Sequence, residues 1–109
     1  MRNRNIAILS LDLIVLILGL KAALSFARFA KVERNFSSVA IGQSRDSVVG
    51  RLGRPNYYSG KCGVIHNPPQ NCTVEYVYGH PFSPLVPEYY IVSFSGDGQV
   101  IQADTWMSP

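Results

Sequence analysis

Residues 41–55 read Ile-Gly-Gln-Ser-Arg-Asp-Ser-Val-Val-Gly-Arg-Leu-Gly-Arg-Pro, and this stretch predicts one short helix with a marked start and end. Ser44 can accept the free amide hydrogens of the first turn, and Asp46 lies where the helix dipole favours an anion. Gly53 suits the left-handed position after the last turn, and Pro55 cannot continue a helix. The predicted apolar face consists of Val48, Val49 and Leu52.

Three segments that follow this helix have the alternation and the β-branched or aromatic content of strands: residues 73–78, 88–95 and 99–105. Residues 79–87 separate the first two segments and contain three prolines, so we expect a long hairpin loop there. The Gly-Asp-Gly sequence at residues 96–98 is typical of a tight turn. The pattern predicts a small antiparallel sheet.

The helix and the strands together carry a family resemblance. The order Gly-x-[Ser/Thr]-x-x-x-Val-x-x-x-Leu-Gly-x-Pro is followed by an aromatic strand and then by a strand ending in Phe-x-x-x-Gly-x-Val. This order resembles the SmpA/OmlA (BamE-like) domain family over residues 36–105. The residues that carry the resemblance are Gly42, Ser44, Val48, Leu52, Gly53, Pro55, the Tyr-Val-Tyr run at 76–78, Phe94, Gly98 and Val100.

The resemblance implies an α+β fold in which two small helices pack on one face of a three-stranded antiparallel sheet. Residues 36–41 would be the first of these helices, or a turn. Residues 56–60 are compatible with a turn or a short edge strand. In the family, this fold supports outer-membrane protein assembly, so the resemblance also implies a scaffolding role in the cell envelope.

The N-terminal part is strongly apolar. A helix over residues 6–27 would be about 33 Å long, which is enough to cross the hydrocarbon core of a bilayer. Asp12 opposes membrane insertion by roughly 3 kcal/mol, but twelve Leu, Ile and Val residues favour insertion by about 0.5 kcal/mol each. We therefore predict a retained signal anchor at residues 1–30 and an α+β domain at residues 31–109. The alternative is a signal peptide that is cleaved after Ala27.

Two features of the sequence make conflicting predictions about the side of the membrane on which the domain lies. Two basic residues precede the apolar segment and three follow it, which favours a cytoplasmic domain. The cysteine pair and the family resemblance favour the periplasm, and we adopt that side because the charge difference is only one. No cysteine follows the apolar segment closely, so we expect a single-pass inner-membrane protein and no lipid anchor.

The two cysteines, Cys62 and Cys72, flank an irregular loop, and a disulfide is the leading interpretation for a periplasmic domain. A metal site would combine them with His66 and His80, but the Cys-x-x-Cys spacing of structural zinc sites is absent.

We expect no cofactor, since no phosphate-binding glycine loop is present. We expect no catalytic group, because the histidines and acids are scattered. The chain has 10 Lys+Arg against 7 Asp+Glu, and the basic residues flank the apolar segment, which argues against nucleic-acid binding.

The sequence therefore predicts a non-enzymatic, membrane-anchored module that binds proteins of the cell envelope. The alternatives are an inhibitor or immunity-type protein for a periplasmic enzyme or toxin, and an accessory transmembrane subunit of an inner-membrane complex. Expected partners are other membrane or envelope proteins and the bilayer around residues 6–27, without a small-molecule substrate. The candidate partner-binding residues are Asp12, Phe82, Leu85, Val86, Tyr89 and Trp106.

Overall fold

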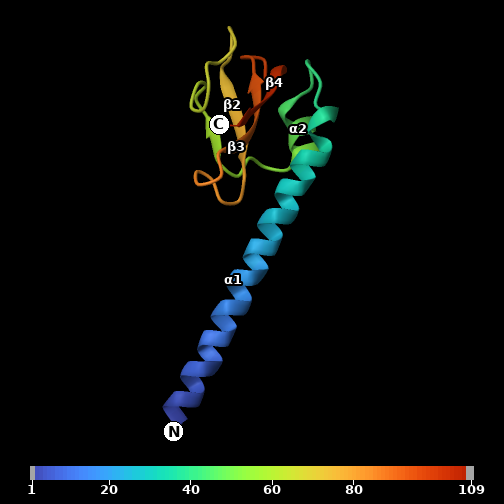
Figure 1. Cartoon of the computed structure of the whole chain (residues 1–109). Helices are drawn as coiled ribbons and strands as arrows, with labels where there is room; N and C mark the ends of the chain where they lie inside the picture. Colours follow the sequence, from blue (N-terminus) through green and yellow to red (C-terminus); the bar gives the residue numbers. More distant parts are fainter. Residues whose placement is uncertain (1, 108–109) are drawn as a thin grey trace.

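The computed structural model describes residues 2–107, with side chains described from residue 6 onward. Its first element is one uninterrupted helix, α1 (Arg2–Asn35), of 34 residues. At 1.5 Å per residue this helix is about 51 Å long, and it projects from a small helix-and-sheet domain (Figure 1). The molecule accordingly measures 65 × 28 × 22 Å.

Helix α1 has two parts with different surroundings. Its outer part contains an 18-residue window of mean hydropathy 2.3, and no part of that window is buried. This makes it long and apolar enough to cross a membrane, and its exposure differs from that of a buried core helix. Near its other end Phe29 and Val32 are buried against the domain, so the last turns of α1 belong to the core.

The helix predicted from residues 41–55 is confirmed as α2 (Arg45–Leu52). The Ser44 hydroxyl accepts a hydrogen bond from the Ser47 amide at 3.1 Å, as an N-cap does. Gly53 ends the helix at a φ of +86°, a value that disfavours residues with a side chain. Of the predicted apolar face, Val48 and Leu52 are buried and Val49 is half-buried.

The sheet is an antiparallel meander in the order β1-β2-β3-β4. The strands are β1 (Tyr58–Gly60), β2 (Val74–Gly79), β3 (Glu88–Phe94) and β4 (Val100–Met107). The prediction of three strands is therefore wrong by one. Residues 56–60, for which a turn and a short edge strand were both open, contain the added strand, which pairs with β2.

The prediction of two small helices also needs correction. Residues 36–41 contain only a single 3-10 turn, η1 (Phe36–Ser38), which leaves α2 as the one short α-helix among the described residues. The end of α1 packs against the sheet beside α2 (Figure 1). The Asn35 side-chain amide donates to the Arg51 carbonyl at 2.9 Å and links the ends of the two helices. The fold class, α+β after a long apolar helix, is confirmed.

The helices cover one face of the sheet and form the main core with it. Tyr78, Val92 and Phe94 pack there against Val32 of α1 and Val48 of α2, as the alternation of the strands predicts. The Tyr78 hydroxyl donates to the Gly53 carbonyl at 2.8 Å, which ties the sheet to the end of α2. Burial raises the pKa of Tyr78 well above its usual value, so this hydroxyl stays a donor.

The opposite face of the sheet carries a second, smaller core. Val77, Tyr89 and Ile91 are buried there, with Ile65 from the loop between β1 and β2 packed against them. That loop, residues 61–73, therefore serves as the cover for this face, where no helix among the described residues lies. Both faces of the sheet are covered, which suits a domain with a thin core.

Candidate functional site

The first candidate surface is the loop between β2 and β3, residues 80–87, which lies beside α1. The Phe82 ring stands edge-on to the Phe26 ring of α1, with centroids 5.2 Å apart. The His80 ring contacts both Phe26 and Phe29, at 5.5 and 5.2 Å. An aromatic cluster therefore joins the loop to the helix at the point where the apolar segment ends.

This loop exposes apolar side chains although it is anchored at its base. Phe82 is 55% exposed and Leu85 is 90% exposed, whereas Val86 is half-buried. The backbone is closed locally, because the Val86 amide donates to the Phe82 carbonyl at 3.1 Å. Of the three partner residues predicted in the loop, Phe82 and Leu85 thus present apolar surface.

A basic cavity lies next to the same end of the domain. Its volume is about 370 Å³, and it is lined by the basic residues Arg28, Lys31 and Arg54 and by apolar residues that include Phe29 and Leu52. None of the described residues that line it is acidic. The cavity therefore favours an anionic group that carries an apolar part.

The second candidate surface is the free edge of β4. Only its first residue is paired on that side: Val100 exchanges backbone hydrogen bonds of 2.8 Å with Gly42 and Gln43. From residue 101 to 107 the outer edge has no strand partner among the described residues. The Thr105 amide donates to its neighbour's carboxylate, Asp104 Oδ1, at 2.8 Å.

Two large apolar side chains lie at the end of this edge. Trp106 is 41% exposed and Met107 is 61% exposed. The Trp106 ring contacts the His66 ring, with centroids 6.3 Å apart, and His66 Nε2 lies 3.6 Å from Asp104 Oδ2. The loop of residues 61–73 thus supports the inner side of β4 and leaves the edge open.

The remaining predicted partner residues differ in their accessibility. Asp12 is exposed in the middle of the apolar part of α1. Tyr89 is only 5% exposed, and its ring packs 4.9 Å from that of Tyr57, so it contributes to the second core instead of to a surface. Strand alternation places Tyr89 on the side of the sheet opposite to its neighbour Tyr90, but alternation does not show that a loop covers that side.

The two cysteines are joined as predicted. Their sulfur atoms are at bonding distance and their Cα atoms lie 6.3 Å apart, within the range of a disulfide. The four residues of the alternative metal site do not come together, since His80 packs against α1 while the cysteines lie over the opposite face. The bond fastens both ends of the loop that covers this face.

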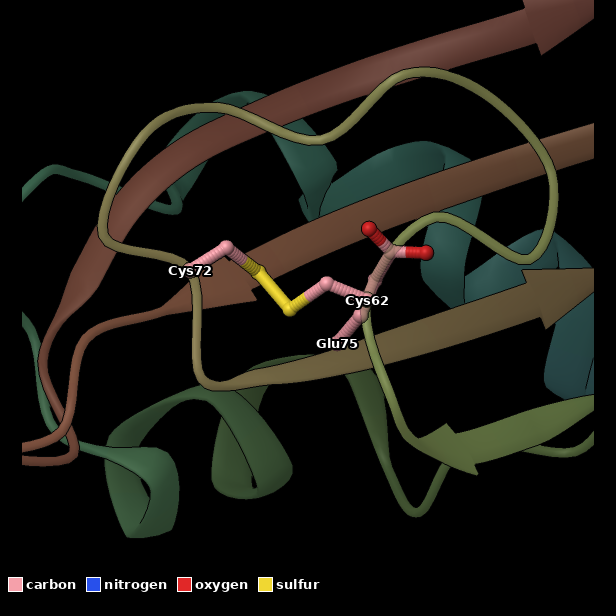
Figure 2. A group of neighbouring side chains, drawn as sticks. All are labelled: Cys62, Cys72 and Glu75. Atoms are coloured by element: carbon pink, nitrogen blue, oxygen red, sulfur yellow. A yellow bond between two sulfur atoms is a disulfide. The ribbon is translucent and has the colours of Figure 1, made fainter.

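Glu75 is an unusual neighbour of the disulfide that the sequence did not single out. Its carboxylate is fully buried beneath the loop, and one oxygen and both sulfur atoms lie within 4.8 Å of one another (Figure 2). Neither oxygen has a hydrogen-bond partner among the described residues. A buried carboxyl group without a partner destabilises a fold.

Replacing Glu75 with methionine is therefore expected to raise the free energy of unfolding by about 1–3 kcal/mol, because the substitution removes an unpaired polar group at similar volume. Urea unfolding of the full chain in detergent micelles, followed by Trp106 fluorescence, measures the change. The half-buried Glu88 provides the control, and Glu88→Met should stay within about 0.5 kcal/mol of wild type. A clear loss of stability in Glu75→Met would show that the carboxylate has a stabilising partner.

No protein-family model matches the chain, and neither the curated proteins nor the solved structures contain a match to it. The SmpA/OmlA resemblance of the sequence accordingly stays a prediction, and a proposal for function rests on the geometry of the chain itself.

Proposed function

We propose that this protein is a non-enzymatic, membrane-anchored module that binds another protein through the free edge of β4 and so stabilises a complex of the cell envelope. The observation that carries the proposal is the open edge from residue 101 to 107, which ends in the exposed Trp106 and Met107. Long unpaired edges are usually blunted or covered in monomeric proteins, because they pair readily with another chain. Their retention here favours a partner.

Binding at this edge would follow the pattern of strand addition. An extended segment of the partner would form main-chain hydrogen bonds with β4, and these would provide affinity without strong sequence preference. Trp106 would act as the anchor side chain, since buried tryptophans carry a large share of binding energy at protein interfaces. The loop of residues 61–73 supports Trp106 from the inner side through His66, which limits the entropy lost on binding.

The anchor would be the outer part of α1. Its length, its mean hydropathy of 2.3 and the complete exposure of its most apolar window support a transmembrane position. The last turns of the same helix are packed into the domain through Phe29 and Val32. A retained helix would therefore hold the domain directly at the membrane surface, without a flexible linker.

The disulfide supports a periplasmic position of the domain. Disulfides form and persist in oxidising compartments and are rare in the cytosol. The pairing of Cys62 with Cys72 thus agrees with the periplasmic side, which the count of basic residues alone disfavours. The proposed location is the inner membrane, with one spanning helix and the domain in the periplasm.

Substitution of Trp106 with arginine is expected to weaken partner binding at least about tenfold, because it removes an anchor worth about 2 kcal/mol. The test is affinity purification of the full-length protein from gently solubilised membranes, with mass spectrometry of the retained proteins. Val64→Arg is the matched control, since Val64 is exposed to a similar extent but is not part of β4. Equal recovery of partners by both variants would contradict the proposal.

The identities of the retained proteins separate the alternatives. Several membrane subunits would agree with a scaffold, whereas one enzyme in equal amount, with its activity lost, would favour an inhibitor. The exposed Asp12 gives the transmembrane-subunit alternative its own test, because intramembrane acids usually face a partner. Loss of co-purification on Asp12→Leu, with no effect of Trp106→Arg, would favour that alternative.

A further inference from the structure

The loop of residues 80–87 combines three properties that suit a lipid surface. Its sequence, His-Pro-Phe-Ser-Pro-Leu-Val-Pro, contains no Asp, Glu, Lys or Arg. It exposes Phe82 and, almost completely, Leu85. It also lies at the end of the sheet closest to the outer part of α1, opposite the end that carries the loop of residues 61–73 (Figure 1).

The contact between Phe26 and Phe82 fixes the depth of this loop relative to the apolar helix. Twenty residues at 1.5 Å each cover the roughly 30 Å of a hydrocarbon core, so a span that begins at Ile6 ends at Ser25. Phe26 then lies at the boundary between hydrocarbon and headgroups. Because the Phe82 ring is 5.2 Å from the Phe26 ring, Phe82 lies at the same boundary.

The basic cavity lies next to this boundary and is electrostatically complementary to the phospholipid headgroup layer. Arg28 and Lys31 follow Phe26 by two and five residues, a rise of about 3 and 8 Å along the helix. The headgroup layer on each side of a bilayer is about 5–8 Å thick. Arg28 and Lys31, together with Arg54, therefore lie at the level of the lipid phosphates, which attract cations.

We propose that the loop of residues 80–87 inserts Phe82 and Leu85 into the interfacial layer of the same bilayer, beside the point where α1 leaves it. The domain would then be attached to phospholipid at two places, the helix and the loop. This attachment would fix its tilt and hold the β4 edge at a constant distance from the membrane. The inference rests on the transmembrane anchor proposed above.

A lipid surface fits the loop better than a protein partner does. The ring contact between Phe26 and Phe82 makes the loop continuous with the apolar part of α1. A single apolar environment can therefore surround both the loop and the helix. Phenylalanine and leucine on an amphipathic surface bordered by arginine and lysine are typical of interfacial membrane contact. A second copy of the chain or another protein could cover the loop in place of lipid, and the following experiment distinguishes these cases.

The test uses tryptophan as a depth probe in the full-length protein. Trp106 is the only tryptophan of the sequence, so a Trp106→Phe background is free of other indole signals. Three probes are introduced one at a time: Leu85→Trp in the loop, Leu13→Trp in the helix and Val64→Trp in the loop of residues 61–73, which is attached to the opposite end of the sheet. Each variant is reconstituted into phosphatidylcholine vesicles with bromines either shallow or deep in the acyl chains.

We expect shallow bromines to quench Leu85→Trp at least twofold and more strongly than deep bromines do. Leu13→Trp should be quenched most by deep bromines, and Val64→Trp should be affected by neither. An unquenched Leu85→Trp beside a quenched Leu13→Trp would overturn the proposal and leave the anchor intact. A blue-shifted, unquenched Leu85→Trp that depends on protein concentration would assign the loop to a second copy and would overturn it equally.

If Leu13→Trp itself is unquenched, the helix does not lie in the bilayer. That result would contradict the transmembrane anchor and the loop insertion that depends on it. The two failures are thus distinguished within one set of samples.

Discussion

Replacing both Cys62 and Cys72 with alanine is expected to lower the free energy of unfolding by about 2–3 kcal/mol. The two residues are separated by 10 positions, and a cross-link of that length restricts the unfolded chain by about this amount. The bond also closes the loop of residues 61–73 over the second core. Urea unfolding of the full chain in detergent micelles, followed by Trp106 fluorescence, measures the loss.

Chemical reduction provides the matched control for the disulfide. Wild-type protein with a phosphine reductant should unfold at the same midpoint as the double alanine variant, and the reductant should not change the variant further. The expected loss is a large part of the total stability of a domain with so thin a core. An unchanged midpoint on reduction would show that the covered face is held without the bond.

Introducing lysine at both Leu13 and Leu16 is expected to release the protein from the membrane. Each lysine near the centre of a span opposes insertion by about 3 kcal/mol and removes about 0.5 kcal/mol contributed by leucine. The wild-type segment inserts with a net gain of roughly 3 kcal/mol by the same arithmetic, after the opposing effect of Asp12. The double substitution therefore reverses the sign, and alkaline extraction of membranes measures the result.

The control for this experiment places two lysines on α1 and just after it, outside the apolar segment. Ala30→Lys/Ser37→Lys changes two exposed positions and adds the same charge. This variant should remain in the membrane pellet to the same extent as wild type. Release of both variants would point to a general effect of charge, and release of neither would contradict a span centred near Leu13.

The parts of the fold that the sequence predicts well depend on local signals. Helix α2 begins after Ser44 and ends at Gly53 because a capping hydroxyl and a left-handed glycine act within one turn of the helix itself. The alternation in β2 and β3 separates the two faces of each strand for the same reason, since it depends only on neighbouring residues.

The parts that it misses depend on tertiary contacts. β1 has three residues and ends in Gly60, so it becomes a strand only by pairing with β2. The mixed sequence after Arg28 does not reveal that Phe29 and Val32 are buried, because their burial depends on where the sheet lies. This explains why the end of α1 takes the place of the expected first small helix.

The candidate surfaces show the same division. Phe82 and Leu85 can be identified in the sequence as candidate binding residues, because apolar residues in a proline-rich loop are unusual. Both are exposed in the structure. The burial of Tyr89 and Glu75 has no local signal, since it depends on how the loop of residues 61–73 folds over the sheet. The open edge of β4 is likewise a property of strand order, which no single strand encodes.

The most direct test of the membrane-anchored module is alkaline extraction of wild-type membranes, followed by the intact mass of the protein in each fraction. The account predicts that the protein stays in the pellet with residues 1–27 attached and two hydrogens lost to the disulfide. A soluble protein that begins at Arg28 would contradict it. The domain would then be a released periplasmic protein, and neither the spanning helix nor the lipid-contacting loop would stand.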